Sequence, residues 1–175
     1  MSEAILKAQD TEELFEIVDC DDKVIGLAKR RECHGNPKLV HRTAHVVVYH
    51  PDGSVLLQKR SLAKDVQPGK WDTAVGGHLS PGENYEAGAR REMTEELGLP
   101  SNAKLEFLFK AEIRNSIESE NVGVFSTVCE GPFQFNRDEI DQVRFWTREE
   151  LNSALGAGAK DFTPNLLKEL KSLLS

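Results

Sequence analysis

The chain has 175 residues, of which 29% are charged and 39% hydrophobic, and its formal net charge is −7. This length and balance predict a single domain, residues 1–175, and the negative charge disfavours a nucleic-acid backbone as main partner, although a local basic groove stays compatible with it. There is no apolar run of membrane-spanning length, no CxxC spacing among the three cysteines and no signal-peptide core, so we expect a cytoplasmic protein without disulfides.

The first third of the chain predicts short strands joined by turns. Residues 14–28 (LFEIVDCDDKVIGLA) predict an N-terminal hairpin around an acidic turn at 19–22, and residues 29–34 predict a short helical piece. The clearest hairpin is 43–60, where two β-branched or apolar runs flank the turn sequence Pro51-Asp52-Gly53.

A loop and a helix follow. Residues 61–70 (SLAKDVQPGK) predict a loop, and 71–77 (WDTAVGG) predict a strand that ends at paired glycines. After a second loop through Pro81-Gly82, a helix is predicted over about 84–97. Its apolar stripe has four-residue spacing and consists of Tyr85, Ala89, Met93 and Leu97.

The remaining segments predict three further strands and two helices. The strands are 103–113, 121–130 and 142–146, and helices open at Thr147, which forms a capping box with Glu150, and at Thr163-Pro164. Strands outnumber helices and most are neighbours in sequence. The pattern therefore favours the α/β class, with a mixed sheet and helices packed on its faces.

Three glutamates crowd the end of the predicted helix. Glu92, Glu95 and Glu96 are three or four residues apart or adjacent, and like charges at that spacing cost a helix about 0.2–0.5 kcal/mol per pair. They also lie near the C-terminal end, where the helix dipole favours cations. Taken alone, the cluster could be a solvated charged face or the ligands of a hard divalent cation such as Mg²⁺.

The spacing around these glutamates matches a known signature. Five residues separate Gly77 from Glu83, seven more lead to Arg91-Glu92, and Met93, Glu95-Glu96, Gly98 and Leu99 complete the pattern G-x5-E-x7-R-E-U-x-E-E-x-G-U, where U is aliphatic. The segment 77–99 thus resembles the Nudix box. The resemblance implies the Nudix fold, an α/β/α sandwich in which the box forms a loop, a helix and a loop.

The resemblance also implies a chemistry. Nudix hydrolases cleave a diphosphate joined to another moiety, with Mg²⁺ or Mn²⁺ as cofactor, and divalent ions neutralise phosphate charge and acidify bound water. By analogy, three carboxylates and one backbone carbonyl should ligate the metal, those of Glu92, Glu95, Glu96 and Gly76. Glu83 would support the loop, and Arg91 would hold the acidic cluster together or simply pair with Glu95.

A second resemblance, to isopentenyl-diphosphate isomerase, runs from about Glu16 to the C-terminal helix and includes LLQKRSLAKDVQPGKWD. In that family a divalent metal sits on three histidines and two glutamates, and the matching positions are His34, His41, His78, Glu118 and Glu120. Each of these histidines could instead be an ordinary hydrogen-bonded residue. His45 and His50 match no ligand position, and we interpret them as a strand residue and a turn residue.

Three basic residues match further positions of the isomerase. Arg60 and Lys64 match residues that grip the diphosphate and Arg30 matches another basic position, although each could be a plain surface cation. Trp71 could form a wall of the substrate pocket, whereas core packing is the interpretation that we favour for it.

One departure separates this chain from the isomerase. The isomerase uses an essential cysteine in a CGH triplet, and here the triplet is Gly76-Gly77-His78, which lacks a side chain to carry the proton. We therefore predict a pyrophosphohydrolase acting on a small-molecule diphosphate, in which Glu95 or Glu120 activates water. Isomerisation through a substitute acid and a non-catalytic diphosphate or nucleotide sensor are the alternatives. The sequence specifies neither the substrate nor whether the protein forms a homodimer.

Overall fold

The computed structural model describes residues 12–64 and 66–175. In chain order its elements are β1 (Leu14–Val18), β2 (Val24–Lys29), α2 (Arg30–Cys33), β3 (Val40–Tyr49), β4 (Val55–Arg60), β5 (Trp71–Thr73), β6 (Val75–His78), α3 (Tyr85–Leu97), β7 (Glu106–Arg114), β8 (Ser119–Val128), β9 (Ile140–Trp146), α4 (Arg148–Gly156) and α5 (Pro164–Leu173). None of the helices in these two ranges is both long and apolar enough to cross a bilayer.

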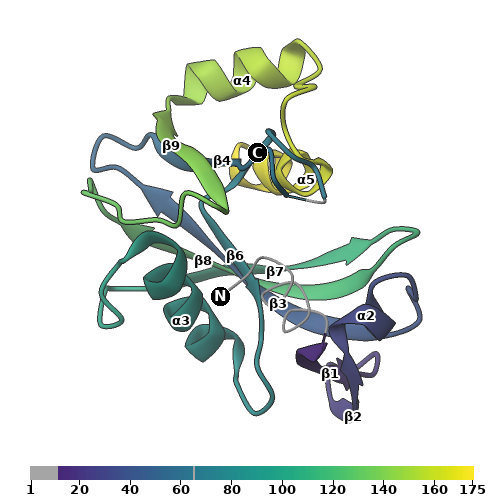
Figure 1. Ribbon diagram of the computed structural model, residues 1–175. Helices are drawn as coiled ribbons and strands as arrows, with labels where there is room; N and C mark the ends of the chain where they lie inside the picture. The colour runs from purple at the N-terminus through teal and green to yellow at the C-terminus, as the bar shows by residue number, and fades with distance from the viewer. Residues whose placement is uncertain (1–11, 65) are drawn as a thin grey trace.

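A seven-stranded mixed sheet forms the centre of the fold (Figure 1). Its main path runs β5-β4-β3-β8-β7, while β6 pairs with β3 and β9 pairs with β4. The β3–β8 pair is parallel and the other pairs are antiparallel. The predicted α/β class with a mixed sheet is thus confirmed.

Helices cover both faces of this sheet because neighbouring residues of β3 point to opposite sides. Val46 belongs to a core that contains Met93 of α3. The next residue, Val47, belongs to a second core with Leu151 of α4 and Leu166 of α5. In Figure 1, α3 accordingly lies on one side of the strands and α5 on the other, which is the α/β/α layering expected from the sequence.

The antiparallel pair β1–β2 and helix α2 form a small module beside the large sheet. Its apolar side chains make a separate buried cluster that includes Phe15, Ile17 and Cys33. Its acidic turn contacts the rest of the fold through Asp22, whose carboxylate accepts hydrogen bonds of 2.8 Å from the Tyr85 hydroxyl and the Lys110 ammonium group. The module therefore contacts the body through polar groups at this turn and through the buried ring of Phe15 in β1.

Most predicted elements occur where the sequence indicates them, with two informative differences. The segment 71–77 is two strands, because the chain leaves β4 after Thr73 and pairs with β3 from Val75 onward. The helix predicted at 84–97 is α3, and the Asn84 side chain caps it by accepting a hydrogen bond from the backbone N–H of Ala87. Strand β7 begins at Glu106, three residues later than predicted, because residues 100–103 form a turn.

Candidate functional site

The double glycine of β6 lies directly against the acidic face of α3. A Cβ atom added to Gly77 would lie 2.0 Å from the carboxyl carbon of Glu92, so only glycine leaves room for that carboxylate. The backbone N–H of Gly76 donates to Glu96 over 3.4 Å, and the amide of Gln58 donates to the same oxygen over 3.1 Å. Two of the three glutamates therefore converge on the glycines.

This convergence is electrostatically unfavourable for a metal-free protein. Burial raises the pKa of Glu92, and the same effect, together with the charge of Glu92, raises the pKa of Glu96 to about 8. A divalent cation bound here would replace the lost hydration and remove the repulsion. The donor set, carboxylates beside the backbone of Gly76 and Gly77, fits a hard ion.

Arg91 connects the acidic residues of the loop and the helix. Its guanidinium group donates to Glu83 over 2.7 and 2.9 Å, to Glu92 over 2.7 Å and to Glu95 over 3.1 Å. It also donates to the carbonyl oxygen of His78 over 2.9 Å. Glu95 is the most exposed of these carboxylates, with 60% of its side chain accessible. Arg91 thus fixes the loop before α3 onto the helix itself.

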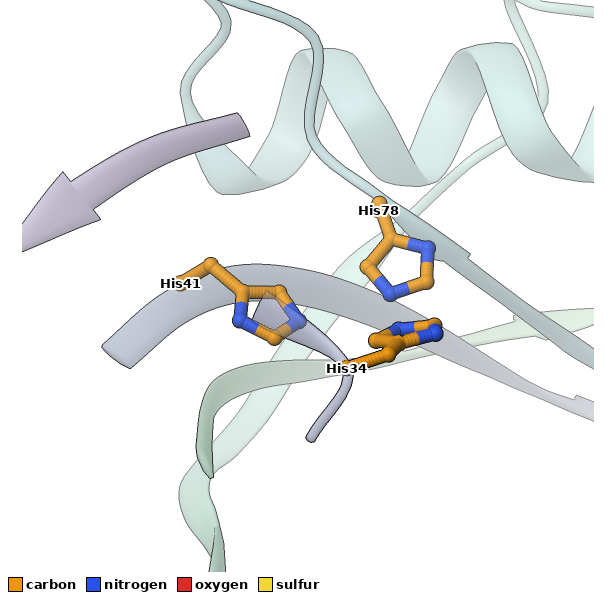
Figure 2. A group of neighbouring side chains, drawn as sticks. All are labelled: His34, His41 and His78. Carbon is orange, nitrogen blue, oxygen red and sulfur yellow. The ribbon is translucent and has the colours of Figure 1, made fainter. Parts of the chain in front are cut away.

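A second cluster contains the three predicted histidines and lies at the start of β3. Figure 2 shows the rings of His34, His41 and His78 turned toward one another, although they come from the turn after α2, from β3 and from β6. Their ring centroids are 5.2 to 6.1 Å apart. The Nε2 atoms of all three are buried and have no hydrogen-bond partner that meets geometric criteria among the described residues.

The two predicted glutamates complete this cluster. Glu120 is the register partner of His41 in the parallel β3–β8 pair, and its Oε1 lies 3.4 Å from Nε2 of His41 and 3.3 Å from Nε2 of His78. Oε2 of Glu118 lies 3.4 Å from Nε2 of His34. Within the described part of the chain, two groups of three potential ligand atoms lie within 4.8 Å of one another: His34 with His41 and His78, and His41 with Glu118 and Glu120. The box glutamates form no group this tight.

The charge states in this cluster suit metal binding. Burial, with help from the charge of Arg30, lowers the pKa of His34 to about 4, and burial also lowers the pKa of His78. For Glu120, burial acts to raise the pKa, but the adjacent imidazoles of His41 and His78 outweigh it and hold that pKa well below its usual range. Neutral imidazoles beside an ionised carboxylate are the forms that bind a divalent ion.

Phe15 covers the histidine cluster, which the sequence did not indicate. Its ring stacks on His78 at a centroid distance of 4.3 Å and on His41 at 5.0 Å, and only 1% of the residue is exposed. The strand pattern of residues 14–18 points Phe15 and Ile17 to the same buried side. That alternation in the sequence indicates that Phe15 is buried, but it does not indicate which residues Phe15 contacts.

The predicted substrate-binding cations are all engaged with carboxylates. Arg60 lies 3.3 Å from Asp72, Lys64 lies 3.5 Å from Glu139, and Arg30 lies 3.4 Å from Glu13. Trp71 is 9% exposed and packs edge-on against Trp146 in the core shared with α4 and α5. Core packing, the interpretation favoured from the sequence, describes the observed contacts of Trp71, and a role as a pocket wall stays a prediction.

A further buried pair joins β3 to α5. Nδ1 of His45 lies 2.7 Å from Oε2 of Glu169, and Glu169 is 7% exposed. Burial alone would lower the pKa of His45, but the Glu169 carboxylate overcomes this effect and raises it to about 9. The sequence interpretation treated His45 as an ordinary strand residue. Its four-residue offset from His41, which puts both on one face of β3, was the only sequence signal.

Comparison with known proteins shows which family the sequence matches. A family model described as the NUDIX domain matches residues 39–166. An uncharacterized Nudix hydrolase of Yersinia pestis is 36% identical over 166 residues, which cover 93% of this chain and 86% of the relative. The uncharacterized Nudix hydrolase YfcD of Escherichia coli K12 is 34% identical over 165 residues, with coverages of 90% and 84%.

Solved structures support the same fold. The crystal structure of DR0079 from Deinococcus radiodurans aligns with a TM-score of 0.78 at 24% identity and covers 91% of this chain and 98% of its own. The MutT protein of Methanosarcina mazei aligns with a TM-score of 0.63 at 19% identity, with coverages of 79% and 94%. At these identities the alignments concern the fold alone.

Proposed function

Because this chain belongs to the Nudix hydrolase family, we propose that it is a divalent-metal-dependent pyrophosphohydrolase that cleaves a diphosphate linkage in a small molecule, a nucleoside or isoprenoid diphosphate derivative. The observation that carries this proposal is the approach of Glu92 and Glu96 to the bare strand at Gly76 and Gly77. Their raised pKa values identify a place that gains from a cation.

The residues of the box would divide the work as follows. Glu92 and Glu96, together with Glu95 and the carbonyl oxygen of Gly76, would hold Mg²⁺ or Mn²⁺. When bound, the ion supplies charge neutralisation for the diphosphate and acidifies a water molecule. Arg91 would keep the carboxylates at fixed spacing through its hydrogen bonds to Glu92 and Glu95.

Glu95 is our candidate for the carboxylate that takes a proton from the attacking water. Its side chain is 60% exposed, so it is accessible to water and to a substrate. Glu120, the other candidate, is 5% exposed and is contacted by His41, His78 and the Thr43 hydroxyl. Those contacts favour a ligand role for Glu120, because its oxygens already have partners.

We propose that the cluster of His34, His41, His78, Glu118 and Glu120 binds a second divalent ion. Buried Nε2 atoms without partners are costly unless something coordinates them, and imidazole favours ions of the manganese or zinc type over magnesium. The similarity to the isomerase remains a prediction that rests on these positions.

Arg30, Arg60 and Lys64 would bind the diphosphate by exchanging their carboxylate partners for phosphate oxygens. We propose further that the chain acts in the cytoplasm as one domain. Whether it forms a homodimer is a question for measurement of its mass in solution.

A substrate panel tests the proposed activity. The protein is incubated with nucleoside, sugar-linked and isoprenoid diphosphates in oxygen-labelled water with Mg²⁺ or Mn²⁺, and phosphorus NMR identifies the bond broken. We expect label in a phosphate product and a loss of at least about 100-fold in rate for Glu96→Gln. Glu86→Gln, at an exposed position on the same helix, is the matched control and should retain full activity. No turnover of any compound with either ion would refute the proposal.

A further inference from the structure

His45 occupies a distinctive position in the proposed Nudix site. It lies on β3 on the same face as His41, four residues along the strand, and its register partner on β6 is Gly76. Gly76 is the residue whose carbonyl oxygen we expect to ligate the metal, and whose N–H contacts Glu96. The imidazole is therefore beside the strand segment on which the box carboxylates converge, against the face of β6 opposite to the one that Glu92 contacts.

Glu169 fixes the orientation of this imidazole from the opposite layer. Its carboxylate lies 2.7 Å from Nδ1, and the residue is a buried member of α5 with 7% of its surface exposed. A carboxylate on one ring nitrogen holds the ring in place and directs the other nitrogen away from itself. Among the described residues, Nε2 of His45 has no hydrogen-bond partner. Unlike Nε2 of His34, His41 and His78, it is not fully buried.

Gly76 leaves the free edge of the ring uncovered. A Cβ atom at position 76 would lie 3.2 Å from Cδ2 and 3.3 Å from Nε2 of His45, so any side chain there would press on this edge. The next residue on the same face of β6, His78, turns into the histidine cluster. A glycine at such a point in a strand marks a place where another group can approach closely.

The carboxylates around the ring are engaged by other groups. Asp72 accepts hydrogen bonds from Arg60 and Thr163, and Glu120 lies 3.4 Å from His41 and 3.3 Å from His78. Glu169 faces Nδ1 of His45 itself. Nε2 is thus the ring nitrogen that is left for a ligand.

We infer that Nε2 of His45 donates a hydrogen bond to a phosphoryl oxygen of the bound diphosphate, and that Glu169 acts as its positioning residue. This inference rests on the proposed function, because it places the diphosphate between the box carboxylates and β3. It adds a substrate-binding residue outside the box and a contribution from α5, which contains none of the predicted site residues.

Binding of magnesium pyrophosphate to the full chain tests the inference without knowledge of the substrate. In His45→Asn the amide nitrogen can still reach Glu169, but no atom remains at the position of Nε2. We expect the Kd for magnesium pyrophosphate, measured by calorimetry, to rise about 10- to 100-fold, as for the loss of one hydrogen bond to a charged group. His45→Gln, which restores an amide near Nε2, should bind more tightly than His45→Asn. His50→Asn is the matched control and should bind like the wild type, because the His50 side chain lies at the end of β3 near the β3–β4 turn, where it contacts Asp52 and Phe145.

A spectroscopic measurement separates ligand contact from structural support. The imidazole nitrogen signals of the wild-type protein are recorded by NMR, and the signal missing in His45→Asn identifies His45. We expect its Nε2 signal to move when magnesium pyrophosphate is added, and to move less in Glu169→Gln, which should also raise the Kd. A purely structural role for Glu169 would lower the stability and leave both the Kd and the shift unchanged.

The outcomes distinguish a failure of the inference about His45 from a failure of the proposed function. If the wild type binds magnesium pyrophosphate while His45→Asn binds it equally well and the His45 signal stays fixed, the inference is overturned and the proposed function stands. If the wild type binds no magnesium pyrophosphate and also fails the substrate panel, both are overturned.

Discussion

Replacing Gly77 by alanine should separate the fold of this protein from its metal site. The added Cβ atom would lie 2.0 Å from the Glu92 carboxyl carbon, whereas ordinary contact begins at 3.4 Å, so the carboxylate must retreat by about 1.4 Å (3.4 − 2.0). Gly77 has no positive φ, and the atom displaced is the far end of a flexible side chain. We therefore expect the free energy of unfolding to stay within about 1 kcal/mol of the wild type, since Gly→Ala at a compatible position also restricts the unfolded chain.

The function should respond far more strongly than the stability. A displacement of about 1 Å at a reacting centre can cost on the order of 100-fold in rate, and the metal should bind correspondingly more weakly. Mn²⁺ binding by electron paramagnetic resonance and unfolding in urea are measured on the same samples. Gly26→Ala, in β2 where a Cβ would meet nothing within 4 Å, is the matched control. Unchanged Mn²⁺ affinity and activity in Gly77→Ala would refute the reasoning, because Glu92 would then not need its present position.

Three further predictions concern stability and metal affinity. In EDTA, the His45–Glu169 pair should contribute up to about 3 kcal/mol to the free energy of unfolding below pH 6.5, the ordinary pKa of histidine, and this contribution should disappear as the pH rises through about 9. Urea unfolding of the wild type and of Glu169→Gln at several pH values measures it. A stability difference that does not change with pH would contradict the prediction. Arg91→Met should lower the free energy of unfolding by about 2 kcal/mol in EDTA, because the box carboxylates lose their shared donor. Saturating Mg²⁺ should restore part of the lost stability. A loss of stability that Mg²⁺ does not change would contradict a shared cation site. Phe15→Ala should lower the free energy of unfolding by about 3 kcal/mol and weaken Mn²⁺ binding by the histidine cluster. Leu14 is 42% exposed on the opposite side of β1, so Leu14→Ala should change the stability by at most about 0.5 kcal/mol. Equal effects of the two variants in thermal unfolding and metal titration would contradict the packing argument.

The sequence was informative where the relevant contacts are local. The box and the helix within it depend on contacts within about one or two helical turns, and the match of their spacing to the Nudix signature implied both the fold and the type of chemistry. The α/β/α layering was implied by the same resemblance.

Contacts between distant segments were less accessible. His45 and Glu169 are 124 residues apart, and nothing in either local pattern announces the pair. The stacking of Phe15 on two histidines likewise requires the β1–β2 module to dock on the sheet. The split of residues 71–77 into two strands depends on which neighbour each half pairs with, which propensity does not encode.

The parallel alignment of β3 with β8 has a consequence for how the histidine cluster comes into being. His41 and Glu120 are direct register partners although they are 79 positions apart in the chain (120 − 41), and His34 and His78 come from two other segments. Closing loops of that length is entropically slow and must precede any of the favourable pairings. The histidine cluster should therefore bind a transition-metal ion only late in folding, when the native topology is complete. The onset of metal binding during refolding would then report when β3 and β8 pair in their native register.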